Sequence, residues 1–335
     1  MTPPIRLDRR NLLGAAGLGL LATSLSACGS EKASSPSGAP TADSAFPVKI
    51  THKYGTTTVP SAPKRVVSVG LTEQDTLLAL GVIPVGVTEW YGDQPYATWP
   101  WAQDALGGGK PKVLHTDNGF ELEKIVGLRP DLIVGTNAGL EEKDYKLLSA
   151  IAPTVAQSGK FTDYFEPWTS QSTAIGTALG KRTEIDKVIG DVGDEFAAAL
   201  KANPSFQGTK VIFLQNAVYD GSVIAYQKGL STEFLTSLGM EVPEGLEKFA
   251  KEGQAYIPLE QLDVLDSADV LIWATETDKD KTNLEKVPGF KELKAVAAGR
   301  SVYTGGELAG AIYFTSPLSL PYVVDKLTPM LADVL

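Results

Sequence analysis

One long amphipathic segment in the middle of the chain constrains the fold more than any other feature of the sequence. It begins after Gly180, ends at the Asn203-Pro204 pair, and carries its apolar residues along one face at helical spacing. These apolar residues are Ile185, Val188, Ile189, Val192, Phe196, Ala199 and Leu200. The spacing predicts a single helix over 181–203, roughly 33 Å long at about 1.5 Å per residue. A rod of that length can connect two separate lobes.

Both sides of this segment alternate short β-branched runs with helical stretches, which is typical of α/β folds. The buried strands are expected at 65–69, 84–87, 131–134 and 153–155, and then at 210–214, 269–273 and 301–303. The elements around the strand at 131–134 recur in the same order around the strand at 269–273. We therefore expect two Rossmann-like α/β lobes with mostly parallel sheets, over 46–180 and 204–335, and a ligand cleft between them. Because the connecting helix is stiff, we expect the lobes to rock by small angles only.

The first 45 residues are expected to be an export signal and a tether. Basic residues open the chain, an apolar run follows over 12–25, and Leu25-Ser26-Ala27-Cys28-Gly29 resembles a bacterial lipobox. Residues 1–27 are thus a predicted signal peptide, after which acylated Cys28 anchors the protein at the outer face of the cytoplasmic membrane. The pair Arg9-Arg10 resembles a twin-arginine export signal. Residues 28–45 are rich in Ser, Pro, Gly and Ala, which predicts a flexible tether.

Charge and residue counts exclude several function classes. There are 30 Lys and Arg against 40 Asp and Glu, and the net charge of −10 argues against a nucleic-acid partner. The single Cys excludes an internal disulfide and a cysteine zinc site. His52 and His115 are far apart in the sequence, which argues against direct binding of zinc or manganese. The sequence holds no Gly-x-Ser-x-Gly, His-Glu-x-x-His or phosphate-loop motif, so we expect binding without catalysis.

Short segments in a fixed order along residues 46–335 resemble a known family. They read PKRVVS at 63–68, LLALGVIPVGV at 77–87, LRPDLI at 128–133, IGTALG at 175–180, AGRSVY at 298–303 and SPLSLP at 316–321. In this order, behind a lipobox, they resemble the iron-siderophore-binding lipoproteins of bacterial ABC importers, whose two lobes are joined by one helix. The resemblance implies a monomeric receptor without a cofactor of its own. Such a receptor captures a ferric siderophore and delivers it to a permease dimer with its ATPase.

Aromatic side chains crowd the segments that follow the predicted strands, and such segments face the crevice of an open α/β lobe. Rings suit a large chelate because they give much contact area at little cost in entropy. The aromatic residues assigned to the cleft are Trp90, Tyr91, Tyr96, Trp99, Tyr164 and Trp168 in the first lobe, and Tyr219, Tyr226, Trp273 and Tyr313 in the second. Haem or a corrinoid remains the alternative ligand within the same transporter class, since aromatic pockets suit a macrocycle and Tyr can ligate haem iron.

Lys228 and Arg300 are the basic residues expected nearest the cleft, although Arg300 fits a surface turn after Gly299 equally well. No pair of arginines that would clamp a carboxylate-rich chelate is evident in the sequence, which argues against ferric citrate. No protein ligand to a metal is predicted.

The resemblance also suggests how the protein meets its permease. In the family, each lobe presents a Glu to arginines of the permease, six residues before the glycine that closes the first helix of that lobe. The matching residues are Asp75 and Glu233, with Glu73 as a substitute for the shorter Asp75. Residues 72–75 also fit a helix-capping box, in which a carboxylate in the first turn favours the helix dipole.

Overall fold

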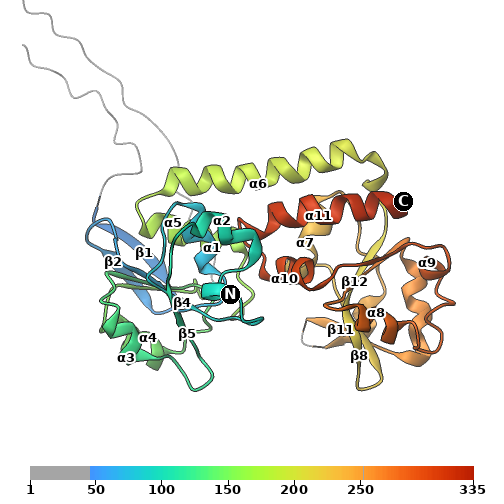
Figure 1. Ribbon diagram of the computed structural model, residues 1–335, viewed down its shortest axis with the longest axis horizontal. Helices are drawn as coiled ribbons and strands as arrows, with labels where there is room; N and C mark the ends of the chain where they lie inside the picture. The colour runs from blue at the N-terminus through green and yellow to red at the C-terminus, as the bar shows by residue number, and fades with distance from the viewer. Residues whose placement is uncertain (1–45, 252) are drawn as a thin grey trace, which may run out of the picture. The chain divides into compact units, whose positions relative to one another are not determined.

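The computed structural model describes residues 46–335 except residue 252. The signal peptide expected over 1–27, the tether expected over 28–45 and the lipid anchor expected on Cys28 therefore lie outside the described residues. In the described part, two α/β lobes each hold a sheet of their own, and helix α6 (Arg182–Ala202) connects them (Figure 1). No helix in this part of the chain is long and apolar enough to cross a membrane.

The sheet of the first lobe is parallel throughout, with five strands in the order β5-β4-β3-β6-β7. The strands are β3 (Val66–Ser68), β4 (Gly86–Thr88), β5 (Lys112–Leu114), β6 (Leu132–Gly135) and β7 (Thr154–Ala156). All residues of β3 and β6 are buried, as expected for strands covered on both faces. The strand order reverses at β3, because β4 and β5 are added on one side and β6 and β7 on the other. Such a switch point opens a crevice at the carboxyl ends of the strands.

Helices cover this sheet, and an antiparallel hairpin packs beside it. The helices are α1 (Glu73–Ala79), α2 (Pro100–Leu106), α3 (Leu122–Gly127), α4 (Glu142–Ser149) and α5 (Trp168–Ala178), with a 3-10 turn η1 (Pro95–Ala97) before α2. The hairpin of β1 (Val48–His52) and β2 (Gly55–Val59) contacts α5 and β7. Leu77 of α1, Leu132 of β6 and Ile175 of α5 are fully buried together in the core of this lobe.

The sheet of the second lobe is mixed rather than mostly parallel, with six strands in the order β10-β11-β9-β8-β12-β13. The strands are β8 (Val211–Tyr219), β9 (Ser222–Tyr226), β10 (Ala250–Lys251), β11 (Gln254–Pro258), β12 (Val270–Ala274) and β13 (Ser301–Tyr303). Only β8, β12 and β13 run parallel. The difference arises at Asp220-Gly221, where φ values of 47° and 75° form a tight turn. This turn leads β8 directly into β9, where we expected the chain to continue into a helix.

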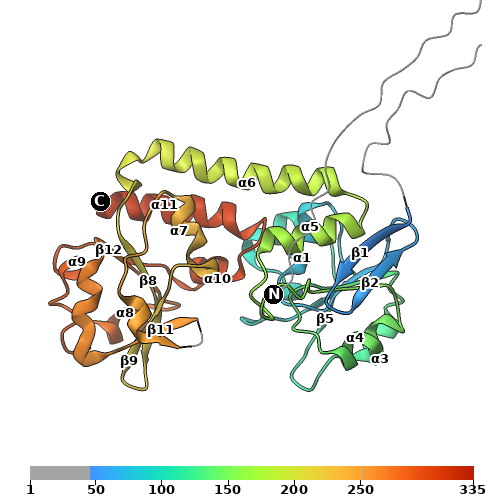
Figure 2. The ribbon, with the colours of Figure 1, turned by 180° about the vertical axis from the view of Figure 1, so that it is seen from behind.

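Helices pack on both faces of the second sheet. They are α7 (Glu233–Ser237), α8 (Asp278–Leu284), α9 (Lys294–Ala297), α10 (Gly306–Phe314) and α11 (Ser319–Val334), with 3-10 segments η2 (Pro204–Phe206), η3 (Leu230–Thr232), η4 (Leu246–Phe249) and η5 (Leu259–Ser267). Side chains of β12 alternate between two cores, with Ile272 on the α10–α11 face and Trp273 on the α8–α9 face. Helices α11 and α6 lie side by side when seen from the front and from behind (Figures 1 and 2).

Helix α6 belongs to the cores of both lobes. Its Ile185 is buried in the core of the first lobe, whereas Val192 and Phe196 are buried in the core of the second. Its 21 residues span roughly 31 Å at about 1.5 Å per residue. At its first turn, a Cβ on Gly176 of α5 would lie 2.4 Å from Ile185, so that glycine permits the close approach of α5 and α6. Since one continuous apolar stripe serves both cores, the helix fixes each lobe to the same rod.

Candidate functional site

Two hollows open at the carboxyl ends of the strands, where the lobes meet, and we call them together the groove. The Tyr164 hollow has a volume of about 220 Å³, and its lining includes Thr72, Asn137, Tyr164, Trp168, Leu230, Glu233 and Tyr313. The Tyr91 hollow has a volume of about 320 Å³ and is lined by Tyr91, Gly92, Gln94, Trp99, Pro100, Glu276, Gly306 and Glu307. Both linings combine residues that follow strands of the first lobe with residues of the second.

Trp90 and Tyr91, which follow β4, carry the aromatic wall of the first lobe. Their rings meet edge-on with centroids 4.3 Å apart, and Tyr91 meets Trp99 at 5.0 Å. Trp90 also contacts Phe314, at the end of α10 in the second lobe, with centroids 5.2 Å apart. Phe314 lines the Tyr164 hollow and Tyr91 lines the other, so Trp90 lies where the two hollows adjoin.

Trp99 and Trp101 join the lobes more than they line the groove. Their rings stack at 4.9 Å with an interplanar angle of 17°, and only 6% of Trp99 is exposed. A Cβ on Gly310 of α10 would lie 2.5 Å from the Trp99 ring, so the ring rests on the backbone of the other lobe. Trp101 meets Phe314 at 5.4 Å. The floor of the groove is therefore a packed aromatic contact between the lobes.

Three tyrosines form the wall of the second lobe. Tyr226 is largely buried, stacks on Phe213 at 5.0 Å and meets Tyr313 at 5.8 Å. Tyr313 lines the Tyr164 hollow. Tyr219, at the end of β8, is 43% exposed, and its hydroxyl donates to Asn216 Oδ1 at 2.7 Å. Tyr226 thus supports the wall from behind and Tyr313 lines the Tyr164 hollow, whereas Tyr219 is an exposed ring beside them that lines neither hollow.

Tyr164 and Trp168 come from the segment between β7 and α5. Tyr164 is 55% exposed, and its hydroxyl donates to the carbonyl of Ala138 at 3.2 Å. Its ring covers Gly139, where a Cβ would lie 2.4 Å from the phenol, and Gly139 itself has a φ of 56°. Trp168 begins α5 and packs against the core of the second lobe. Both residues line the Tyr164 hollow.

The phenols of the groove stay protonated at neutral pH. Burial, followed by the nearby carboxylate of Glu276, raises the pKa of Tyr91 to about 12. Burial also raises the pKa of Tyr313, with smaller contributions from Tyr226 and Tyr91. Burial, followed by the Glu276 carboxylate, also raises the pKa of Tyr219. These rings therefore offer apolar faces and hydroxyl donors, not phenolate oxygens.

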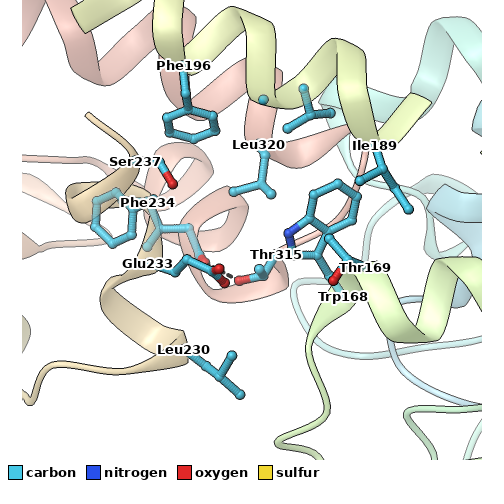
Figure 3. A pocket seen from close by; sticks show the side chains of 13 residues that line it. Trp168, Thr169, Ile189, Phe196, Leu230, Glu233, Phe234, Ser237, Thr315 and Leu320 are labelled. Carbon is cyan, nitrogen blue, oxygen red and sulfur yellow. Dashed lines mark hydrogen bonds between the residues drawn. The ribbon is translucent and has the colours of Figure 1, made fainter. Parts of the chain in front are cut away.

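An apolar cavity of about 180 Å³ lies beneath α6 and adjoins the Tyr164 hollow, with which it shares Trp168, Leu230, Glu233 and Thr315. Figure 3 shows the side chains of Phe196, Phe234 and Leu320 around it, with Glu233 of α7 pointing toward the same space. Glu233 is exposed to solvent. The one charged side chain of this cavity therefore lies where the cavity meets the groove.

The structure does not bring four predicted residues to the groove. Trp273 is completely buried, because its position on β12 directs it into the core with Phe290, 5.3 Å away. Arg300 is exposed in the turn that precedes β13, at the opposite end of that strand from the groove. Lys228 and Tyr96 are exposed on turns and line neither hollow. The prediction for Trp273 is wrong because its side chain faces the core side of the sheet. Arg300 lies in the surface turn that the sequence allowed equally well, at the end of β13 that faces away from the groove.

Asp75 does not present a carboxylate to a partner, because it is completely buried between the lobes. Its Oδ2 accepts hydrogen bonds from Trp101 Nε1 at 2.8 Å and from Ser316 Oγ at 2.5 Å. Ser316 belongs to the second lobe and also caps the start of α11 by accepting from the backbone N–H of Ser319 at 2.9 Å. Burial raises the pKa of Asp75 to about 7, although both hydrogen bonds lower it. The carboxyl group thus connects the two lobes.

Glu73, the substitute expected for docking, is also buried, with 1% exposed. Its carboxylate accepts from the backbone N–H of Asn137 at 2.7 Å and fills the space where a Cβ on Gly70 would lie. Burial raises its pKa. Thr72 makes no capping hydrogen bond to α1; its hydroxyl instead accepts from Asn137 Nδ2 at 2.9 Å. The capping box expected at 72–75 is therefore a clamp that joins the loop after β3 to the loop after β6.

Comparison with known proteins identifies the family. Residues 66–308 match the family described as periplasmic binding protein. The chain belongs to this family. This periplasmic binding protein is 32% identical over 292 residues to the probable siderophore-binding lipoprotein YfiY of Bacillus subtilis, covering 83% of this chain and 85% of the relative.

Two solved structures are similar to this periplasmic binding protein. A periplasmic solute binding protein from Mycobacterium smegmatis is 48% identical with a TM-score of 0.80, over 86% of this chain and 98% of the other. PiaA of Streptococcus pneumoniae in complex with ferrichrome is 27% identical with a TM-score of 0.71, over 86% of this chain and 98% of the other. These likenesses confirm the expected two-lobe α/β fold.

Sequence reasoning missed several polar residues of the groove in this periplasmic binding protein. Thr72 and Asn137 follow β3 and β6, and Glu276 and Glu307 follow β12 and β13. Their signal was the same as that of the aromatic residues, namely a position just after a buried strand. The prediction assigned aromatic side chains to these positions and did not include the carboxylates of Glu276 and Glu307.

Among the residues that the structure describes, no three His, Cys, Asp or Glu side chains gather in one place. His52 is buried and its Nε2 lies 2.9 Å from Thr57 Oγ1, while His115 is exposed. Burial lowers the pKa of His52.

Proposed function

We propose that this periplasmic binding protein captures a ferric siderophore in the groove and delivers it to an ABC permease, without chemistry on the ligand. The observation that carries the proposal is the aromatic lining contributed by both lobes, with Tyr164 exposed and Tyr91 and Tyr313 half-buried along two adjoining hollows. Large flat faces with few polar groups suit a bulky chelate whose iron is already coordinated. The names of the YfiY relative and of the PiaA–ferrichrome structure support the same ligand class.

Haem is the less favoured ligand. A tyrosine that ligates haem iron does so as a phenolate. The pKa values of Tyr91, Tyr219 and Tyr313 are all raised, which disfavours the phenolate form. A siderophore needs no protein ligand to iron, because its own oxygens complete the coordination sphere. The raised pKa values therefore favour a siderophore over haem.

Delivery and anchoring complete the proposal. Of the carboxylates predicted for docking, Glu233 is the one that is exposed, and we assign it the contact with arginines of a permease. Cys28, once acylated after removal of residues 1–27, would hold the protein at the outer face of the cytoplasmic membrane. Mass spectrometry of the membrane-extracted protein would test this, since a diacylglyceryl group on an N-terminal Cys28 is the expected product.

Ligand capture is tested by fluorescence titration of the mature chain. Trp90, Trp99 and Trp101 lie together at the groove, so a bound ferric chelate should quench their emission. The panel contains hydroxamate, catecholate, citrate-type and mycobactin-type ferric chelates, with haem as a further arm. We expect saturable quenching by at least one chelate and no Soret shift with haem.

A matched control separates the groove from the rest of the protein. Tyr164→Ala removes an exposed ring of the groove. The neighbouring Phe165 is 49% exposed but also lines the Tyr164 hollow, so it is not a suitable control. Phe161, which is 42% exposed and does not line that hollow, is the matched control. Loss of affinity in Tyr164→Ala but not in Phe161→Ala supports the groove. Absence of binding across the whole panel would contradict the function.

A further inference from the structure

We propose that the groove selects uncharged or cationic ferric chelates, and that the Glu276 carboxylate contacts the cationic arm of such a chelate. This inference rests on the proposed function, since it names the ligand class within it. It follows from three features of the described residues: the charges that line the groove, the position of Glu276, and the positions of the arginines.

The charged side chains that line the two hollows are all acidic. They are Glu166 and Glu233 in the Tyr164 hollow and Glu276 and Glu307 in the Tyr91 hollow. No Lys, Arg or His is among the lining residues of either hollow. A ligand that enters the groove therefore meets negative potential from both lobes and no compensating cation.

Glu276 is the lining carboxylate that is best placed to act on the ligand. It follows β12, is exposed, and faces the wall of the first lobe closely enough to raise the pKa of Tyr91. It also raises the pKa of Tyr219 on its own lobe. Among the described residues its carboxylate has no hydrogen bond or ion pair, whereas Glu307 lies near enough to Tyr322 to raise the pKa of that phenol. An unpaired carboxylate between two aromatic walls is ready to accept a ligand N–H.

None of the arginines among the described residues lines the groove. The Arg65 guanidinium donates to the Leu128 carbonyl at 2.6 Å, and Arg182 pairs with Asp186 on α6 at 2.9 Å. Arg129 and Arg300 lie on turns before β6 and β13, at the ends of those strands that face away from the groove. The groove thus lacks the bidentate donors with which proteins hold carboxylate-rich anions.

The chemistry of ferric chelates turns this charge pattern into selectivity. Three hydroxamates neutralise Fe³⁺ and leave an uncharged complex, whereas three catecholates leave three negative charges. Each negative charge near unpaired carboxylates in a partly wet groove costs about threefold to fivefold in affinity, and a cationic arm gains a similar factor. A tris-catecholate complex is therefore disfavoured by more than tenfold relative to a neutral complex of similar size.

The test uses three ligands with one iron core. Ferrioxamine B carries a terminal ammonium, its N-acetyl derivative is uncharged, and its N-succinyl derivative is anionic. Calorimetric titration of the mature chain at low salt is expected to give affinities in that order, with about a tenfold span that narrows in high salt. In Glu276→Gln the span is expected to shrink by about threefold to fivefold.

Glu292→Gln is the matched control, because Glu292 is an exposed carboxylate of the same lobe that lines neither hollow. Its charge span should equal that of the unaltered protein. Equal affinity for the three derivatives, an unchanged span in Glu276→Gln, or tight binding of ferric enterobactin, a tris-catecholate, would each overturn the inference while leaving the function intact. If no ferric chelate of any charge binds, the proposed function itself fails, and this inference fails with it.

Discussion

Asp75→Asn tests the energetic cost of the buried carboxyl group that connects the lobes. Burial raises the pKa of Asp75 from an ordinary 3.8 to about 7. The folded protein therefore keeps its proton in a pH range where the unfolded chain has lost it. Stability associated with this group is accordingly present below pH 4 and is lost as the pH rises from about 4 to about 7.

The size of the effect follows from the same two values. The difference between 3.8 and about 7 corresponds to at most about 4 kcal/mol, since each pKa unit is worth about 1.4 kcal/mol. An asparagine has the same shape, and its Oδ1 can accept from Trp101 and Ser316 without carrying a charge. The pKa of about 7 already includes both hydrogen bonds, so they are not counted again. The asparagine Nδ2 would take the place of Asp75 Oδ1, which is buried without a hydrogen-bond partner, and its unpaired N–H donors offset about half of the gain. We expect Asp75→Asn to be more stable than the unaltered protein by about 2 kcal/mol at pH 8 and no more stable at pH 4.

Urea denaturation of both proteins at pH 4, 6 and 8 measures this difference. The titration of Glu73, whose pKa burial also raises, is common to both proteins and cancels in the comparison. A matched control is Asp325→Asn, since Asp325 is 71% exposed on α11. If Asp75→Asn is less stable than the unaltered protein at pH 8, the ionised carboxylate is a net stabilising link, and the reasoning from burial is refuted.

Three further predictions address the groove and its floor. Trp90→Ala, which removes the ring that contacts both Tyr91 and Phe314, should weaken chelate binding about tenfold by calorimetry; a loss below twofold would remove Trp90 from the site. Gly310→Ala places a Cβ 2.5 Å from the buried Trp99 ring and should destabilise the protein by about 1–3 kcal/mol in urea denaturation. Gly190→Ala on α6 meets nothing within 4 Å and should be neutral or stabilising; equal losses in the two variants would show that the Trp99 contact is unimportant. Glu233→Ala should reduce iron uptake by cells without loss of chelate affinity in calorimetry, while Glu244→Ala, at another exposed carboxylate, changes neither; normal uptake would exclude Glu233 from docking, and lost affinity would assign it to the groove alone.

The arrangement of the lobes was largely predictable, because it depends on periodicities that the sequence displays directly. The stripe from Ile185 to Leu200 needs only helical spacing to be recognised, and the buried runs around β3, β6, β8 and β12 are strongly β-branched. The β8–β9 hairpin was missed although Asp220-Gly221 is a strong turn signal, since the run before it was expected to continue into a helix.

The groove was predictable only where the position of a strand end was clear. Tyr91, Tyr164 and Tyr313 lie there as expected. Trp273 lies in the core because a continuous apolar run does not show which of its residues face which side of a sheet. Asp75 looked exposed because it is a charged residue in a first helical turn. Its burial depends on Ser316, 241 residues away in the sequence, and no local pattern predicts such a partner.

The floor of the groove, where Trp99 rests on Gly310 and Trp101 meets Phe314, has a consequence for the timing of transport. These contacts are made by side chains and backbone of the two lobes themselves, so the walls need no ligand to bring them together. A preformed site binds without the entropy cost of closing, and its affinity is then set mainly by the rate of release. Slow spontaneous release protects captured iron from loss at the cell surface. Unloading at an acceptable rate then requires a partner that separates the walls, and the work for that step must come from outside this chain.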